Sequence, residues 1–103
     1  MIEIDESFDG RQIDVPVGES LVINLKENPT TGYTWHLSGN PEPYLDLEEA
    51  TVIAARVDPP GQPGIHRWRL KARESGTAKL AFEYQRPWEN SSLRQLTFNL
   101  HVV

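Results

Sequence analysis

Cysteine is absent from all 103 residues of the chain. This excludes disulfide bonds, thiolate metal sites and a cysteine nucleophile, and it leaves the redox compartment open. Basic residues are also few, because 10 Lys and Arg stand against 15 Asp and Glu, for a net charge of −5. Nucleic-acid binding draws most of its affinity from clustered Lys and Arg, so we expect no nucleic-acid partner.

Long apolar runs are missing as well. The N-terminal segment MIEIDESFDG is acidic and contains no apolar run of signal-peptide length. No other stretch approaches the roughly 18 apolar residues of a spanning helix. We expect a soluble protein with no membrane partner; a cytoplasmic location and, after removal of a leader, a periplasmic or secreted one both remain open.

No segment carries a sustained helical period. Apolar residues instead recur with period two, which is typical of strands with one buried face. We predict strands near residues 2–5, 12–15, 20–26, 33–38, 51–57, 65–73, 77–85 and 95–102. The clearest apolar sets, and hence the predicted core, are Leu21/Ile23/Leu25, Tyr33/Trp35/Leu37, Trp68/Leu70/Ala72, Leu80/Phe82/Tyr84 and Leu96/Phe98/Leu100/Val102.

Turn residues separate these strands, with Pro, Gly and Asn between successive apolar runs. About eight strands in about 100 residues is typical of a sandwich. We therefore predict an all-β, immunoglobulin-like antiparallel sandwich of about seven or eight strands, without a disulfide, forming one domain over residues 1–103. The least regular stretches are 7–11 and 39–47.

Three segments contain more than a turn needs: NPTTGYTW at 28–35, DPPGQPG at 58–64 and RPW at 86–88. In the first, the Asn28 side chain can bond the backbone, Pro29 fixes φ and Gly32 permits positive φ. Thr30 and Thr31 would then lie at a rigid tip suited to insertion into a cleft. A simple connection between two strands is the alternative.

The second and third segments differ in kind. Prolines and glycines make 58–64 a long loop that cannot join a sheet ladder, which by itself explains most of its composition. In the third, Pro87 ends a strand and a polar run follows, which places Trp88 on a loop. Large aromatic residues on loops are favoured binding anchors; a tryptophan folded back over the core is the alternative.

Strand direction links the three segments. If successive strands alternate in direction, alternate connections emerge at the same end of a sandwich. The three segments are then the B–C, D–E and F–G connections, and they share one end. An edge of this kind is typical of a binding surface built from loops.

At these residues the sequence resembles the chagasin family of cysteine-peptidase inhibitors over essentially the whole chain. The resemblance implies an immunoglobulin-like fold and no catalytic activity. It implies that Thr31 approaches the catalytic cysteine of a papain-like peptidase, while Trp88 covers the primed side of the cleft and the loop around Gly64 lies on the non-primed side. The peptidase-binding residues implied are Asn28, Pro29, Thr30, Thr31, Gly32, Tyr33, Gly61, Gln62, Pro63, Gly64, Arg86, Pro87 and Trp88.

The D–E connection departs from the family pattern. Members tend to carry G-x-G-G there, whereas this chain has Gly61-Gln62-Pro63-Gly64. Which side chain would fill the S2-like pocket is therefore open. The implied mechanism is reversible occlusion of the cleft by a free monomer, without a peptide bond presented for attack and without a cofactor or metal.

Two alternatives to an inhibitor are an enzyme and a non-inhibitory recognition module. An enzyme would need to draw its catalytic or metal-binding side chains from His36, His66 and His101, the serines and the carboxylates. These residues do not have the spacing of any known catalytic or metal-binding motif. A non-inhibitory recognition module could use Tyr33 and Trp88 as stacking platforms for carbohydrate or protein. Titration of papain separates this alternative from an inhibitor.

Overall fold

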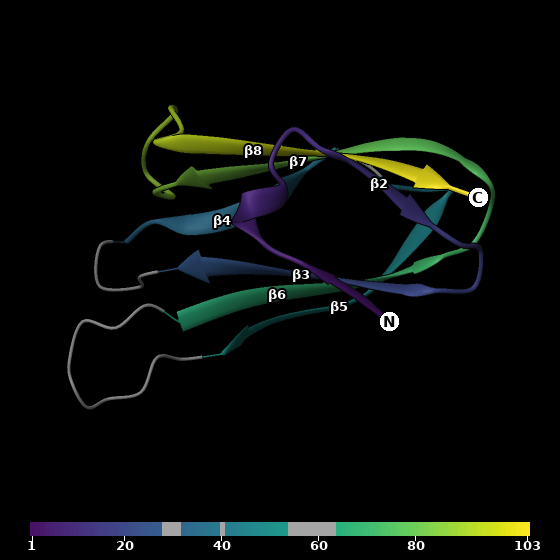
Figure 1. Cartoon of the computed structure of the whole chain (residues 1–103). Helices are drawn as coiled ribbons and strands as arrows, with labels where there is room; N and C mark the ends of the chain where they lie inside the picture. The colour runs from purple at the N-terminus through teal and green to yellow at the C-terminus, as the bar shows by residue number, and fades with distance from the viewer. Residues whose placement is uncertain (28–31, 40, 54–63) are drawn as a thin grey trace.

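The chain folds as two four-stranded sheets stacked face to face, as the computed structural model shows in Figure 1. The structure describes residues 1–27, 32–39, 41–53 and 64–103. The strand order is β1-β3-β6-β5 in one sheet and β2-β8-β7-β4 in the other. The strands are β1 (Ile2–Ile4), β2 (Gln12–Val15), β3 (Ser20–Glu27), β4 (Thr34–Ser38), β5 (Leu45–Ile53), β6 (Gly64–Ala72), β7 (Gly76–Gln85) and β8 (Arg94–Val102). The predicted sandwich is confirmed.

Strand pairing is antiparallel within the body of each sheet and parallel at one edge of each. β3 pairs with β6, β6 with β5, β7 with β8 and β4 with β7, all antiparallel. β1 runs parallel to β3, and β2 runs parallel to β8. The two parallel pairs differ from the purely alternating succession expected from the sequence, because the N-terminal segment contributes one edge strand to each sheet.

The core lies between the sheets, where alternate residues of the central strands point inward. Leu21, Ile23 and Leu25 of β3 are fully buried, and they face the aromatic rings of Phe82 and Phe98 in the other sheet's strands. The predicted apolar sets are therefore inward-facing. Tyr33, Leu37 and Tyr84 are only partly buried, because they lie near strand ends.

The outer face of β6 carries a row of basic side chains. Arg67, Arg69 and Lys71 are exposed. Arg69 lies 3.1 Å from Glu49 on the neighbouring strand β5. Such exposed pairs contribute little stability, so this face is a solvated surface.

β5 is the element that the sequence misplaced. A strand was expected at 51–57, after an irregular stretch at 39–47, but β5 begins at Leu45 and is described to Ile53; residues 54–57 lie outside the described part of the chain. The register of β5 against β6 shifts between Leu47 and Glu49. A bulge of this kind breaks the period-two pattern, and an edge strand with exposed residues has little apolar alternation to detect.

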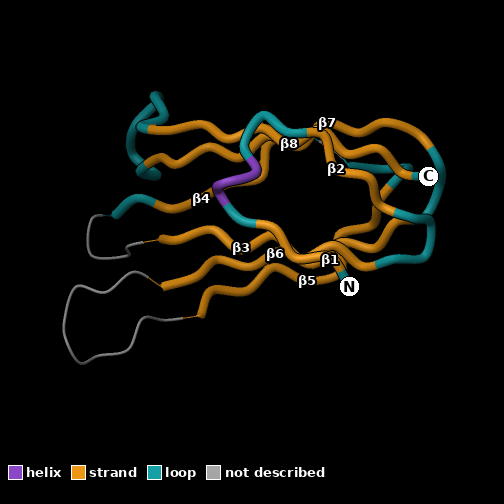
Figure 2. The backbone as a smooth tube through the Cα atoms, viewed as in Figure 1, coloured by secondary structure: helices purple, strands orange, loops and turns teal. Residues whose placement is uncertain are grey.

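The N-terminal segment crosses from one sheet to the other through a short 3₁₀ helix, η1 (Glu6–Phe8), the purple segment in Figure 2. Asp5 caps η1 by accepting hydrogen bonds from the Ser7 backbone N–H at 2.9 Å and the Ser7 hydroxyl at 2.5 Å. These hydrogen bonds stabilise the carboxylate and lower the pKa of Asp5. Within the described ranges, no helix has the length and apolar content needed to cross a bilayer.

The first residue of β7, Gly76, provides a test of packing. A Cβ atom at Gly76 would overlap the ring of Tyr44, which packs against the core. We expect Gly76→Ala to lower the free energy of unfolding by about 1–3 kcal/mol, as overpacking does elsewhere, measured by urea denaturation. In a Tyr44→Ala background the same change should cost less. An equal cost in both backgrounds would contradict the contact.

Candidate functional site

The ends of six strands meet at one end of the sandwich. In one sheet, Glu27 at the end of β3 is paired with Gly64 at the start of β6, and Ile53 at the end of β5 is paired with Ile65. In the other sheet, Thr34 at the start of β4 is paired with Gln85 at the end of β7, and β8 begins beside them. The β3–β4, β5–β6 and β7–β8 connections therefore leave the same end, as the strand ends in Figure 1 show.

The sequence singled out thirteen residues in these connections, and the structure describes six of them. Gly32 and Tyr33 precede β4, Gly64 begins β6, and Arg86, Pro87 and Trp88 follow β7. The other predicted residues lie outside the described residues; they are Asn28, Pro29, Thr30, Thr31, Gly61, Gln62 and Pro63.

Trp88 is exposed, with 70% of its surface accessible. The alternative in which this tryptophan folds back over the core is therefore wrong. Its ring instead packs against Gly32 of the neighbouring connection, where a Cβ atom would lie 2.8 Å from Cη2 of Trp88. Gly32 has a φ of +81°, which confirms the predicted positive value. The β3–β4 and β7–β8 connections are thus in direct contact.

A series of ring contacts runs from the core to Trp88. The buried ring of Trp35 lies 4.7 Å from that of Tyr84, and Tyr84 stacks on Tyr33 at 5.3 Å between centroids. The Arg86 guanidinium lies 4.4 Å from the centroid of Tyr33 and 5.8 Å from that of Trp88. Each such contact contributes modestly, but together they hold the exposed ring on a packed support.

The β7–β8 connection is also held by hydrogen bonds. Arg86 donates from Nη1 to Oε1 of Glu89 at 3.1 Å, and the Leu93 N–H donates to the Tyr84 carbonyl at 2.8 Å. Leu93 is 65% exposed and adds apolar surface to this connection. Sequence reasoning did not include Leu93 or Glu89 in the site, because the polar run 89–92 suggested only a solvated turn.

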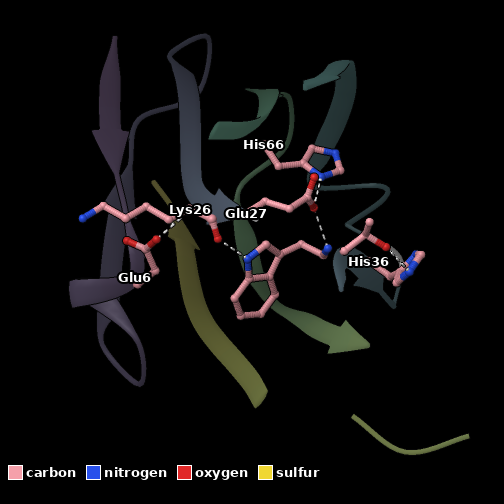
Figure 3. Close-up of polar contacts among 7 residues, drawn as sticks. Glu6, Lys26, Glu27, His36 and His66 are labelled. Carbon is pink, nitrogen blue, oxygen red and sulfur yellow. Dashed lines mark hydrogen bonds and ion pairs between the residues drawn. The ribbon is translucent and has the colours of Figure 1, made fainter. Parts of the chain in front are cut away.

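A buried carboxylate at the base of the connections was also missed. Glu27 is only 3% exposed, and its Oε1 accepts the Trp35 backbone N–H at 2.8 Å and lies 3.0 Å from Nδ1 of His66 (Figure 3). A signal was present, because Glu27 continues the buried phase of Leu21, Ile23 and Leu25. A charged residue in that phase indicates a paired, buried carboxylate.

The three histidines of the chain have separate partners. His36 is exposed, and its Nε2 lies 2.9 Å from the Thr34 hydroxyl, while His66 is paired with Glu27. His101 lies on β8, close to Asp14 at 3.4 Å. The three histidines considered for catalysis are thus distributed over different partners, and the described residues contain no group of three His, Cys, Asp or Glu that could hold a metal ion.

Comparison with known proteins gives a consistent family. The model of the family described as Chagasin family peptidase inhibitor I42 matches residues 14–102. Among curated proteins, Amoebiasin-2 of Entamoeba histolytica is 31% identical over 104 residues, covering 96% of this chain and 83% of the relative. Chagasin of Trypanosoma cruzi is 26% identical over 105 residues, covering 97% and 94%.

Solved structures agree. The cysteine protease inhibitor EhICP2 from Entamoeba histolytica superposes with a TM-score of 0.84 at 27% identity, covering 99% of this chain and 94% of that one. PbICP-C, solved in complex with falcipain-2, has the same fold with a TM-score of 0.77 at 21% identity, and each chain is fully covered. From the matched residues 14–102 and these relatives, this chain belongs to the chagasin family of peptidase inhibitors.

Proposed function

We propose that residues 1–103 act as one inhibitor domain that reversibly blocks papain-like cysteine peptidases by filling the active-site cleft with the β3–β4, β5–β6 and β7–β8 connections. The family consists of inhibitors and not of enzymes. EhICP2 is a cysteine protease inhibitor, and PbICP-C has been solved bound to falcipain-2. The target class of these relatives supports the target class proposed for this chain.

One observation carries the proposal: an exposed tryptophan at the end where the three connections emerge. Trp88 packs on Gly32, and the Arg86 guanidinium lies close to the rings of both Tyr33 and Trp88. A large ring held in place loses little conformational entropy when it is buried by a partner, and aromatic residues are enriched among the residues that dominate binding energy.

Each connection has a proposed role. Trp88, with Arg86 and Pro87, covers the primed side of the cleft, and Thr31 approaches the catalytic cysteine. Asn28, Pro29 and Thr30, together with Gly32 and Tyr33, shape the β3–β4 connection around Thr31. Gly61, Gln62, Pro63 and Gly64 lie along the non-primed side, which selects substrates. No peptide bond is aligned for attack by the thiolate, so the inhibitor leaves the complex intact.

The test is a titration of papain with the protein, using a chromogenic peptide substrate. We expect competitive, reversible inhibition, because the connections occupy the site that the substrate needs. Trypsin serves as the control and should retain full activity, since it is a serine peptidase whose active-site cleft differs from that of papain. Equal inhibition of both enzymes would contradict the specificity, and no inhibition of papain would favour a recognition module that binds carbohydrate or protein through Trp88.

A further inference from the structure

We propose that Glu27 and His66 form a positioning pair that fixes the β3–β4 and β5–β6 connections relative to each other before a peptidase binds. This inference rests on the proposed function of these connections. Neither residue is among those proposed to bind the peptidase. Both lie where the connections join the strands: Glu27 is the last residue of β3, and His66 is the third residue of β6.

One carboxylate oxygen of Glu27 joins three strands. Its Oε1 accepts the Trp35 N–H of β4 at 2.8 Å and lies 3.0 Å from Nδ1 of His66 on β6 (Figure 3). β3 and β6 are neighbours in one sheet, whereas β4 belongs to the other. The contact therefore ties the two sheets together at the end from which the connections emerge.

The β3–β4 connection is held at both ends by this arrangement. Glu27 precedes it and Trp35 follows it, and a second bond runs from Nε1 of Trp35 to the carbonyl of Lys26 at 2.8 Å (Figure 3). Two hydrogen bonds join Trp35, after the connection, to Glu27 and Lys26, before it. They fix the separation and relative direction of the two strand ends that the connection joins. The position of Gly32, which lies between these residues, is constrained by these bonds.

The orientation of His66 is fixed independently of Glu27. Its ring stacks on Trp68 with 3.8 Å between centroids and 14° between planes. This stacking fixes the plane of the imidazole, in which Nδ1 lies 3.0 Å from Oε1 of Glu27. Gly64, the first residue of β6, lies only two residues before His66. Holding the His66 ring therefore also holds the start of β6, where the β5–β6 connection ends.

Burial of this carboxylate is costly, which argues for a role beyond packing. Taking an ionised group out of water is unfavourable, and a protein with an apolar side chain in its place is often as stable or more so. Hydrogen bonds compensate Glu27 here: among the described residues, no buried side-chain nitrogen or oxygen lacks a partner. What an apolar residue could not supply is a directional link from β3 to both β4 and β6.

The experiment compares matched variants in one papain assay. Glu27→Gln keeps the size of the side chain and an acceptor for Trp35 but removes the charge that strengthens the contact with His66, and His66→Phe keeps a ring to stack on Trp68 but removes Nδ1. The control pair lies at the opposite end of the sandwich, where His101 and Asp14 form a similar contact at 3.4 Å. Its variants are His101→Phe and Asp14→Asn.

We expect Glu27→Gln and His66→Phe each to raise the inhibition constant about three- to tenfold, which corresponds to the weakening or loss of one hydrogen bond, in samples that are fully folded at the assay temperature. The double variant should lose little more than either single variant, because both changes act on the same contact. The control variants should inhibit like the wild type. A lower Tm with inhibition within about twofold of wild type would overturn the inference, because it would leave a structural role alone.

Hydrogen exchange of the free protein separates this inference from the proposed function. In both variants the amides of Trp35 and Ile65 should exchange faster than in the wild type, while those of β8 should not. If wild-type protein fails to inhibit papain, the proposed function fails, and this measurement alone decides the positioning role. Unchanged exchange at Trp35 and Ile65, or an equal increase throughout the chain, would overturn it.

Discussion

Replacing Trp88 by alanine should raise the inhibition constant against papain about thirtyfold, equivalent to about 2 kcal/mol of binding free energy at an aromatic hot spot. The ring is 70% exposed in the free protein, so its burial by the peptidase accounts for the loss. Few contacts within the chain are lost, and Tm should stay within about 5 °C of the wild-type value. Inhibition and thermal melting are measured on the same sample.

The control for this prediction is another exposed apolar residue far from the connections. Val17 is 50% exposed, and its N–H is bonded to the carbonyl of Val103 at the opposite end of the sandwich. Val17→Ala should leave both Tm and inhibition unchanged. A stable Trp88→Ala protein that inhibits as well as the wild type would contradict the proposed anchor and would assign binding to residues 28–31 and 61–64.

Gly32→Ala should weaken inhibition about tenfold or more, for two separate reasons. The φ of +81° is unfavourable for any residue with a Cβ atom, by about 1–2 kcal/mol. The new Cβ would also lie 2.8 Å from Cη2 of Trp88, so that the tryptophan ring must move. Both effects displace the binding surface, and the measurement is again the inhibition constant with Tm as a check on folding.

Gly18 offers a matched control, because it has a similar φ of +89° but nothing within 4 Å of its Cβ position. Gly18→Ala should cost some stability and leave inhibition unchanged. Combining Gly32→Ala with Trp88→Ala should cost less than the sum of the two single changes, since residues in contact are not additive. Strict additivity would mean that the contact between Gly32 and Trp88 does not contribute to binding.

Much of the site was open to sequence reasoning because it depends on local chemistry. The positive φ of Gly32 follows from the turn in which it lies, and the exposure of Trp88 follows from Pro87 and the polar run after it. The contact between Glu27 and His66 could not be predicted from local sequence. The burial of Glu27 follows from the alternation along β3, but His66 is 39 residues away in the sequence. Only the pairing of β3 with β6 brings the two residues together.

The sandwich, its core faces and the three connections were determined by the sequence itself, because period-two burial and turn residues act over a few neighbouring positions. Tertiary structure alone decided the parallel edge pairs β1–β3 and β2–β8, the start of β5 at Leu45 and the bulge between Leu47 and Glu49. It also decided that Trp88 packs on Gly32 and that Glu27 joins β4 to β6. These features depend on residues distant in sequence meeting at a particular register, which no local pattern encodes.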